Sequence, residues 1–172
     1  MELTQGVRFD SLGLSPEIMR AIGQRRIEES TPVQAGCIPP MMEWRDVIAK
    51  APTGTGKTFA YGIPIVEHVE PENESVQAVI LAPTRELAIQ ITDEMRDLAT
   101  YKPGVRMVCL YGGAPIGRQI DALKKHPQIV VATPGRLSDH MKRRTVRVES
   151  AQTVVLDEAD RMLDMGFVHD VT

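Results

Sequence analysis

A glycine-rich segment that ends in lysine and threonine gives this sequence its clearest sign of chemistry. Residues 51–58 follow the phosphate-loop pattern G-x-x-x-x-G-K-[ST], with alanine in the first glycine position. Glycine lets backbone N–H groups turn inward around a phosphate, and the next helix adds positive potential at its N-terminus. The alternative is a flexible turn with a chance lysine. The predicted cofactor-binding residues of this loop are Ala51, Pro52, Thr53, Gly54, Thr55, Gly56, Lys57 and Thr58.

Two acidic residues, Asp157 and Glu158, directly follow the apolar run Val154-Val155-Leu156. Asp157 would hold Mg²⁺ through water, and Glu158 would orient or deprotonate an attacking water molecule. Acidic residues also favour a helix N-terminus on electrostatic grounds, which is the better explanation of the pair taken alone. Together with the loop, the pair predicts a site for ATP hydrolysis. Its catalytic residues would be Lys57, Asp157 and Glu158, and its metal ligands Thr58 and Asp157.

Short apolar runs alternate with amphipathic stretches from Asp46 onward. The runs are expected to be strands, over residues 46–50, 76–82, 105–111, 128–132 and 153–156. The stretches between them have apolar helical faces, formed by Leu87, Ile91, Met95 and Leu98, by Ile116, Ile120 and Leu123, and by Leu137 with Met141. This alternation predicts an α/β fold with a mostly parallel sheet, buried by helices on both faces. Ligands bind such sheets outside the carboxyl ends of the strands.

The first 45 residues are predicted to be a helical N-terminal extension, part of the same domain as residues 46–172. Ser15-Pro16-Glu17 has the residue types of a helix N-terminus, followed by Ile18 and Ile22 on one face. Thr31-Pro32-Val33-Gln34 begins a second helix in the same way, and Pro39-Pro40 is expected to end it.

Composition and charge limit the classes of protein to which this sequence can belong. Charged residues form 25% and hydrophobic residues 42% of the 172 residues, which is typical of a globular chain. A net charge of −3 neither favours nor excludes nucleic acid, because a groove needs only a local basic patch. The sequence shows no membrane span or secretion signal, so a cytoplasmic protein is expected. Cys37 and Cys109 suit buried apolar positions, and the four histidines have no metal-ligand spacing.

Further motifs extend the pattern to a known family. Residues 157–160 read Asp-Glu-Ala-Asp, and the chain resembles the DEAD-box ATP-dependent RNA helicases over nearly its whole length. The matching segments are Pro83 to Ala88, Gly112-Gly113, Thr133 to Arg136, and Phe9 with the Thr31 to Gln34 adenine-reading motif. The resemblance implies a RecA-like P-loop NTPase domain that binds ATP, ADP and Mg²⁺, and RNA as the partner.

The residues that would contact RNA follow strands and open helices, so their hydroxyls and guanidinium groups are expected at one edge of the sheet. Such an arrangement binds backbone phosphates without reading bases. Thr133-Pro134 also fits an ordinary helix start, and both interpretations can hold together. The role of the glycine pair rests on the resemblance alone. The predicted RNA-binding residues are Pro83, Thr84, Arg85, Gly113, Thr133, Pro134, Gly135 and Arg136.

Gln34 has two possible roles. It completes a capping box with Thr31, and its amide also matches the N6 donor and N7 acceptor of adenine, the role favoured beside a phosphate loop. Phe9 is expected to pack behind the motif. Two residues depart from the family pattern: Arg26-Ile27 replace the usual Gly-Phe, so Ile27 would contact the nucleotide without a π-face, and Ser30 replaces a proline.

The resemblance also implies parts that lie beyond Thr172: a Ser-Ala-Thr segment and a second RecA-like domain with arginine fingers. The chain is therefore expected to be truncated after the Asp-Glu-Ala-Asp motif, to bind nucleotide and to hydrolyse it hardly at all. The strand carrying Ser-Ala-Thr would lie between strands 46–50 and 153–156. Its absence should leave a slot filled by a strand from a separate polypeptide, a rearranged or collapsed sheet, or a fragment that associates. A helicase-like translocase acting on DNA and a non-catalytic nucleotide-binding module are the alternatives.

Overall fold

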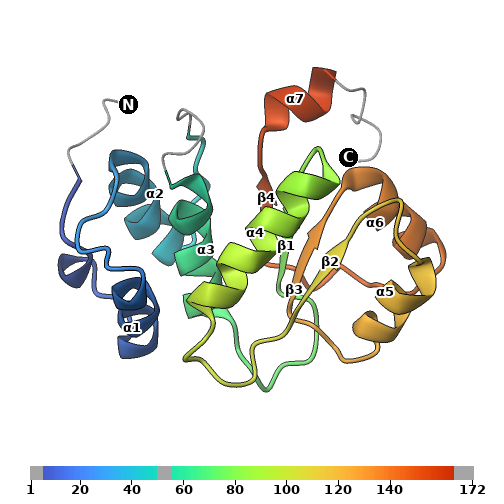
Figure 1. Cartoon of the computed structure of the whole chain (residues 1–172), viewed down its shortest axis with the longest axis horizontal. Coiled ribbons are helices and arrows are strands. Elements are labelled where there is room, and N and C mark those ends of the chain that lie inside the picture. Colours follow the sequence, from blue (N-terminus) through green and yellow to red (C-terminus); the bar gives the residue numbers. More distant parts are fainter. Residues whose placement is uncertain (1–5, 50–55, 165–172) are drawn as a thin grey trace. The chain divides into compact units, whose positions relative to one another are not determined.

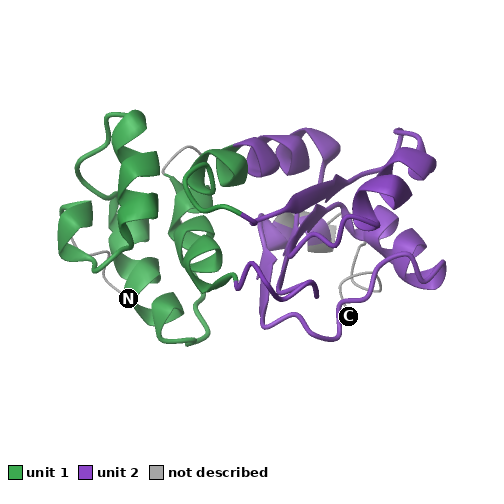
Figure 2. Cartoon of the chain, turned by 90° about the horizontal axis from the view of Figure 1, so that it is seen from below, with its two compact units in different colours: residues 1–69, 94–103 green, residues 70–93, 104–172 purple. Residues whose placement is uncertain are grey.

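A computed structural model describes residues 6–49 and 56–164 of the chain. These form two compact units, residues 1–69 with 94–103 and residues 70–93 with 104–172, coloured separately in Figure 2. No helix among the described residues is long and apolar enough to cross a membrane. The expectation that one domain contains a helical extension of residues 1–45 stays a prediction.

Unit 1 begins with the 3₁₀ helix η1 (Phe9–Ser11) and the helices α1 (Pro16–Gln24), α2 (Pro32–Met42) and α3 (Lys57–His68). The hydroxyl of Ser15 accepts a hydrogen bond from the Ile18 N–H at 3.3 Å, which confirms the predicted N-cap of α1. Ile18 and Ile22 are buried, as their spacing predicts. In the same unit α2 packs against α3, with Val33, Cys37 and Ala60 in the contact.

The prediction that Pro39-Pro40 ends the second helix is wrong. Helix α2 continues through both prolines to Met42. Each proline lacks the N–H that would donate to the carbonyl four residues earlier, and its ring crowds that carbonyl. The packing of α2 against α3 in the same unit stabilises the helix in spite of this cost.

The strand predicted over residues 46–50 is not formed at 46–49, the part of it that the structure describes. Ile48 is 93% exposed, so the apolar run that suggested a strand has no apolar cover there. A strand exists only through pairing with a neighbour, and none of the described strands pairs with these residues. The sequence pattern could not reveal whether a pairing partner is present.

Unit 2 contains a parallel sheet of β1 (Ala78–Leu81), β2 (Met107–Leu110), β3 (Ile129–Ala132) and β4 (Thr153–Leu156), in the order β2-β3-β1-β4. Figure 1 shows these strands with the helices that connect them. The registers align residue 78 with residues 129 and 153, and residue 107 with residue 129. The predicted α/β class with a parallel sheet is confirmed, and β1 and β3 are buried throughout, as expected of parallel strands.

Strand β4 departs from the expectation of burial on both faces. Val154 and Leu156 are 61% and 41% exposed and alternate with partly buried Thr153 and Val155. Within the described sheet β4 is an edge strand whose one pairing is with β1. The apolar composition of residues 153–156 therefore predicts the strand but not the cover over one of its faces.

The other helices are α4 (Arg85–Leu98), α5 (Ile116–Leu123), α6 (Pro134–Lys142) and α7 (Ala159–Asp164). Ile91, Met95 and Leu98 are fully buried, as the spacing in α4 predicts. Leu137 of α6 is buried, but Met141 is 46% exposed, so its predicted place on a buried face is wrong. The core of unit 2 joins the strands to α5 and α6 through Val79, Val108, Leu110, Leu123, Val130 and Leu137.

Lys102 stabilises the C-terminal end of α3 within unit 1. Its ammonium donates hydrogen bonds to the carbonyls of Val66, Glu67 and Val69 at 2.7, 3.1 and 2.8 Å. These carbonyls have no partner within the helix, and a cation there also complements the helix dipole. Burial lowers the pKa of Lys102, while Glu67 and Glu17 act in the opposite direction. The helix that begins at Lys57 is thus held at its far end.

Candidate functional site

The phosphate loop leads directly into α3. Gly56 occupies the N-cap position with φ of 80°, in the left-handed region that favours glycine, and Lys57 is the first residue of the helix. Lys57 and Thr58 are partly buried. The predicted residues Ala51, Pro52, Thr53, Gly54 and Thr55 lie outside the described residues. What is described has the glycine conformation and the helix start that bind phosphate in other proteins.

Gln34 connects α2 to this loop within unit 1. Its Oε1 accepts a hydrogen bond from the Thr31 N–H at 2.8 Å, and the Thr31 hydroxyl accepts one from the Gln34 N–H at 3.4 Å, which completes the capping box. Its Nε2 donates to the carbonyl oxygen of Gly56 at 3.2 Å. The side chain is buried, with 4% exposed. Both ends of the amide are therefore engaged, one with its own helix and one with the loop.

A methyl group at position 56 would overlap the Gln34 amide. Gly56 is thus required twice, by its positive φ and by the close approach of Gln34. The contact between Gln34 and the loop has no signal in the sequence, because neither residue type nor spacing shows that two segments 22 residues apart meet.

Ser30, which replaces the usual proline, ties the N-terminal segment to the start of α2. Its N–H and its hydroxyl each donate to the Val7 carbonyl at 2.7 Å, and its hydroxyl oxygen lies 3.1 Å from the donating Val7 N–H. The Phe9 N–H donates to the Glu28 carbonyl at 3.1 Å, and Phe9 itself is fully buried. A proline at position 30 would lack both the N–H and the hydroxyl. The departure from the family pattern therefore supplies hydrogen bonds of its own.

The second departure falls on a special backbone conformation. Arg26 has φ of 57°, where glycine is the favoured residue, and its N–H donates to the Gly23 carbonyl at 2.9 Å to end α1. Ile27 is partly buried. A glycine in the family pattern at this position suits the same turn without strain, whereas arginine adopts it at a cost.

Four predicted segments of unit 2 follow the four strands. Because all the strands are parallel, their carboxyl ends lie at one edge of the sheet. This edge has the sequence-predicted motifs in the order of the strands from β2 to β4. They are Gly112-Gly113 after β2, Thr133 to Arg136 after β3, Pro83 to Arg85 after β1, and Asp157-Glu158 after β4.

Arg85 and Gly113 are brought together at this edge. Gly113 has φ of 85°, and a Cβ atom added there would lie 3.3 Å from Nη1 of Arg85. The Arg85 guanidinium also lies 5.9 Å from the centre of the Tyr111 ring, within the range of a cation–π contact. The side chain is 53% exposed, and its ion pair with Glu86 measures 3.5 Å. The Arg85 guanidinium is thus positioned beside Gly113 and Tyr111 and is still accessible to an anionic ligand.

The two threonines that precede helices differ in what their side chains do. The Thr84 hydroxyl accepts a hydrogen bond from the Leu87 N–H at 3.2 Å and caps α4. Thr133 occupies the N-cap position of α6 ahead of Pro134, but its side chain makes no capping hydrogen bond. Helix capping therefore explains the Thr84 side chain, whereas the Thr133 hydroxyl does not cap its helix.

Arg136 is held by neighbours rather than exposed. Its Nη1 donates to the Ala114 carbonyl at 3.2 Å and to Oε1 of Gln119 at 3.3 Å, and 14% of its side chain is exposed. Its Nε is buried without a hydrogen-bond partner and lies 3.6 Å from the carboxylate of Asp139. Arg136 thus links the turn after β2 to the start of α6.

Gln119 lies at the centre of a buried polar network. Its Nε2 donates to the Tyr111 carbonyl at 2.8 Å, so its Oε1 is the acceptor, 2.9 Å from Nε2 of His140. This arrangement assigns a proton to His140 Nε2 and leaves Nδ1 to accept from the Thr145 hydroxyl at 2.8 Å. His140 is fully buried, and burial followed by the charge of Arg136 lowers its pKa. The neutral ring therefore supports Gln119, which supports Arg136.

Asp157 and Glu158 directly follow β4, the last strand in the order of the sheet. The Asp157 N–H donates to the Leu81 carbonyl at 2.9 Å, and 9% of the residue is exposed. Glu158 has φ of 51°, and its carbonyl accepts from the Met162 N–H at 3.2 Å at the start of α7. A non-glycine residue in this region is uncommon, and such residues cluster at functional sites.

Comparison with known proteins agrees with this arrangement of motifs. The DEAD/DEAH box helicase family model matches residues 31–172, which is most of the chain. The chain belongs to the DEAD/DEAH box helicase family. Residues 157–160, which spell the family name, directly follow β4, and the phosphate loop directly precedes α3.

Relatives of this DEAD/DEAH box helicase chain include the DEAD-box ATP-dependent RNA helicase CshA of Geobacillus kaustophilus. The two are 55% identical over 163 residues, which is 95% of this chain and 35% of that protein. CshA of Bacillus subtilis is 51% identical over 96% of this chain and 33% of its own length. The chain spans about a third of the length of these curated relatives.

A solved structure shares the fold. The crystal structure of a DEAD box protein from the hyperthermophile Methanococcus jannaschii superimposes with a TM-score of 0.89 at 42% identity, over 95% of this chain and 45% of that one. The match supports the sequence-predicted RecA-like fold class of this family member.

Sequence reasoning missed three residues of this helicase chain that hold its motifs in place. Gln119 and His140 support Arg136, and Ser30 supports the segment before α2. Only weak signals were present. Gln119 lies three residues after Ile116 and four before Leu123, so it shares the apolar face of α5, and it is buried. Histidine is intermediate in its usual burial, whereas His140 is fully buried.

Proposed function

We propose that this chain binds ATP and ADP together with Mg²⁺ and forms the ATP-binding part of an ATP-dependent RNA helicase. The observation that carries the proposal is the transition from Gly56, in the left-handed conformation, to Lys57 at the first position of α3. That geometry directs a helix N-terminus and a lysine at the same point, which suits an anionic phosphate. The names of the relatives, ATP-dependent RNA helicases, support the activity of the whole protein.

The described residues fit such a ligand. Gly56 adopts the left-handed conformation that lets a phosphate loop turn into its helix, and the Gln34 amide packs against it. Gln34 would read adenine with its amide, and Ile27 would contact the base. Thr58 and Asp157 would hold Mg²⁺, which neutralises charge on the phosphates. The remaining nucleotide contacts, from Ala51 to Thr55, stay predictions from the sequence.

Hydrolysis would use the acidic residues. Glu158 would accept a proton from the attacking water or orient it, and Lys57 would stabilise charge on the phosphates. The arginine fingers expected from a second RecA-like domain are worth roughly three to five orders of magnitude in rate. The chain by itself should therefore bind nucleotide while hydrolysing it hardly at all.

RNA would bind along the carboxyl edge of the unit 2 sheet. Arg85 and the Thr133 hydroxyl are the groups there that are positioned and accessible to phosphate oxygens. Pro83, Thr84, Gly113, Pro134 and Gly135 would shape the path, and Arg136 would mainly hold it. Contacts of this type recognise the RNA backbone rather than its sequence. A cytoplasmic location fits an RNA helicase.

Calorimetric titration with ADP and Mg²⁺ tests the proposal. Lys57→Ala should abolish binding or weaken it strongly, because the cation and its phosphate hydrogen bonds are lost together. Glu158→Gln should leave binding nearly intact and, in the full-length protein, suppress hydrolysis. Lys142→Ala, an exposed lysine at the end of α6, is the matched control and should bind like the unmutated chain. Equal losses in the Lys57 and Glu158 variants would contradict this division of roles.

A further inference from the structure

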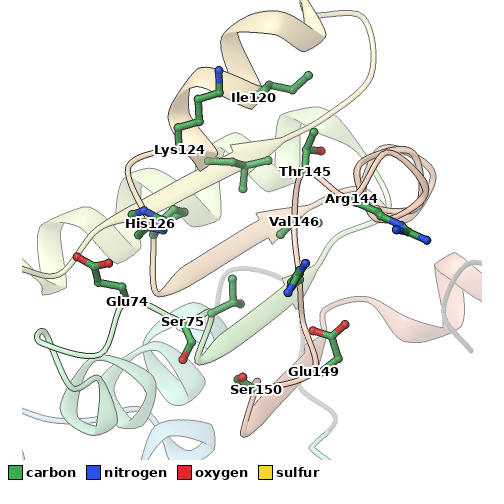
Figure 3. Close-up of a pocket in the computed structure, with 14 residues that line it drawn as sticks. Glu74, Ser75, Ile120, Lys124, His126, Arg144, Thr145, Val146, Glu149 and Ser150 are labelled. Atoms are coloured by element: carbon green, nitrogen blue, oxygen red, sulfur yellow. The ribbon is translucent and has the colours of Figure 1, made fainter.

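Unit 2 has a cavity of about 600 Å³ that none of the motifs above uses. Figure 3 shows it between four segments: residues 74–76, 120–127, 144–147 and 149–150. Its floor is apolar, formed by the buried side chains of Val76, Leu123 and Val146. The volume lies within the range of about 300–1,000 Å³ that is usual for ligand pockets. The one aromatic side chain among its lining residues is the exposed imidazole of His126.

The cavity lies at the opposite edge of the unit 2 sheet from Asp157-Glu158 and the predicted RNA-binding segments. Val76 precedes β1, Pro127 precedes β3, and Ser150 precedes β4, so the lining gathers at the amino ends of the strands. The motifs follow the carboxyl ends of the same strands. A ligand here would therefore not compete for the residues that the proposed function assigns.

The charge around the cavity is concentrated and positive. Lys124, Arg144 and Arg147 line it and are exposed, and among the described residues they form no ion pair within 4.0 Å. Lys125 follows Lys124, and Lys142 and Arg143 directly precede Arg144, in a chain whose net charge is −3. Glu74 and Glu149 stand on the rim as well. The patch is thus basic but interrupted by two carboxylates.

Helix ends explain part of this pattern but not all of it. His126 and Arg144 have φ of 56° and 58°, and the N–H of each donates to the carbonyl three residues earlier, which ends α5 and α6. Arg26 and Trp44 end α1 and α2 in the same conformation, so the turn by itself indicates only a helix end. Cations also favour helix C-termini. Arg147 lies beyond both helices, however, and an apolar hollow is not needed to end a helix.

We propose that this cavity binds a short acidic peptide segment of a partner protein, with one apolar side chain seated on the Val76, Leu123 and Val146 floor. Carboxylates on either side of that anchor would pair with Lys124, Arg144 and Arg147. The spread of the cations suits an extended chain better than one compact anion. RNA fits less well, because a nucleobase seated on the aliphatic floor would bury its polar edge atoms against Val76, Leu123 and Val146 without hydrogen-bond partners.

The test begins with a random peptide library selected on the 172-residue chain and counter-selected on a Lys124→Glu, Arg147→Glu variant. Both side chains are exposed, so the variant should fold normally. The expected sequences contain several acidic residues around an apolar one. A synthetic copy of the enriched peptide, labelled for fluorescence anisotropy, should bind the double variant at least about tenfold more weakly, as expected when paired charges become like charges. Arg96→Glu, an exposed reversal on α4, should leave its affinity unchanged.

Glycine substitutions separate binding from helix ending. His126→Gly and Arg144→Gly relieve the left-handed conformation, so both should raise Tm by roughly 2–4 °C. If the side chains only end helices, peptide affinity will not change. The proposal requires that the more stable Arg144→Gly chain binds the peptide more weakly, with ADP affinity unaltered.

Amide NMR shifts on adding the peptide should fall on residues 74–76, 120–127 and 144–150. Three results would each overturn the proposal: no enriched peptide that distinguishes the chain from the double variant, enriched peptides without acidic residues, or shifts that map elsewhere. If oligo-uridine shifts the same amides and displaces the peptide, the patch is an RNA surface and the proposal is likewise wrong.

Discussion

The Nε2 atom of Gln34 lies 3.2 Å from the carbonyl oxygen of Gly56, to which it donates a hydrogen bond. A residue that a capping box explains locally is thus also in contact with the phosphate loop. The amide nitrogen has a second hydrogen, so adenine can engage the same amide while its hydrogen bond to the loop is kept. Nucleotide binding and the position of the loop are then linked through one side chain.

Gln34→Ala should remove the preference of the chain for ADP over GDP. Unpaired donors and acceptors of a buried base typically cost about 1–3 kcal/mol, which predicts a measurable difference by calorimetric titration. Gln34→Glu keeps an oxygen for the Thr31 N–H but cannot donate to Gly56, so it should weaken both nucleotides. Thr31→Ser keeps the cap and serves as the control. Equal ADP and GDP affinities in the unmutated chain would leave Gln34 with only its cap and its loop contact.

Gly56→Ala should both destabilise the chain and prevent nucleotide binding. The new methyl group would meet the Gln34 amide, and alanine at a φ of 80° adds about 1–2 kcal/mol of strain. The matched control is Gly23→Ala in α1, where a Cβ meets nothing within 4 Å and alanine favours the helix by up to about 1 kcal/mol. Urea unfolding should show opposite signs for the two variants. A Gly56→Ala chain as stable as the original would mean that the contact with Gln34 is easily relaxed.

Local patterns predicted local structure well. Ser15 caps α1 as its position before Pro16 indicates, and β4 spans the predicted residues 153–156. The wrong predictions are those that depend on pairing or packing with other segments of the chain. Residues 46–49 contain an apolar run typical of a strand but have no paired neighbour in the described sheet, and α2, which packs against α3, continues through two prolines.

The residues of the candidate site were likewise predictable where a local motif marks them and not where they depend on distant contacts. Motifs identified Arg85, Gly113 and Arg136, whose meeting at one sheet edge follows from parallel strands. The supports of those residues could not be read from the sequence. Gln119 contacts Arg136 across 17 residues, and Ser30 bonds to Val7 across 23. Such partners depend on tertiary packing, which neither propensity nor periodicity encodes.

His140 should make stability depend on pH. Its folded-state pKa lies below the ordinary value of about 6.5, because burial and then Arg136 disfavour the charged ring. Between those two pKa values the unfolded chain binds more protons than the folded one, so the free energy of unfolding rises with pH. The contribution is complete above about pH 6.5 and is lost as pH falls toward the folded-state pKa.

Urea unfolding across about pH 5 to 8 measures this effect against His140→Gln, whose amide nitrogen can still donate to Gln119. The variant should be less stable at neutral pH but should show a shallower loss on acidification. Because the other histidines are common to both proteins, the difference between the two curves isolates His140. Parallel curves would show that His140 does not change its protonation on unfolding.

Arg85 and Arg136 should affect RNA binding for different reasons. Arg85 is 53% exposed beside Gly113, so Arg85→Ala should weaken RNA binding, leave Tm unchanged and reduce the salt slope by about 0.7, the value for one phosphate contact with a single strand. Arg136 is 14% exposed and bonded to Ala114 and Gln119, so Arg136→Ala should lower Tm as well as RNA affinity. Arg96→Ala, exposed near the end of α4, is the control for a lost surface charge.

Anisotropy titrations at several salt concentrations, with oligo-uridine and a mixed-sequence RNA of equal length, give the affinities and slopes, and thermal melting gives Tm. Each arginine variant should lose affinity for both RNAs by the same factor, because phosphate contacts carry no base information. A loss confined to one RNA would mean that a base is recognised at this edge. If Arg136→Ala kept the original Tm, the hydrogen bonds to Ala114 and Gln119 would not stabilise the turn between β2 and α6. The network from His140 through Gln119 would then have no role in holding the RNA-binding edge.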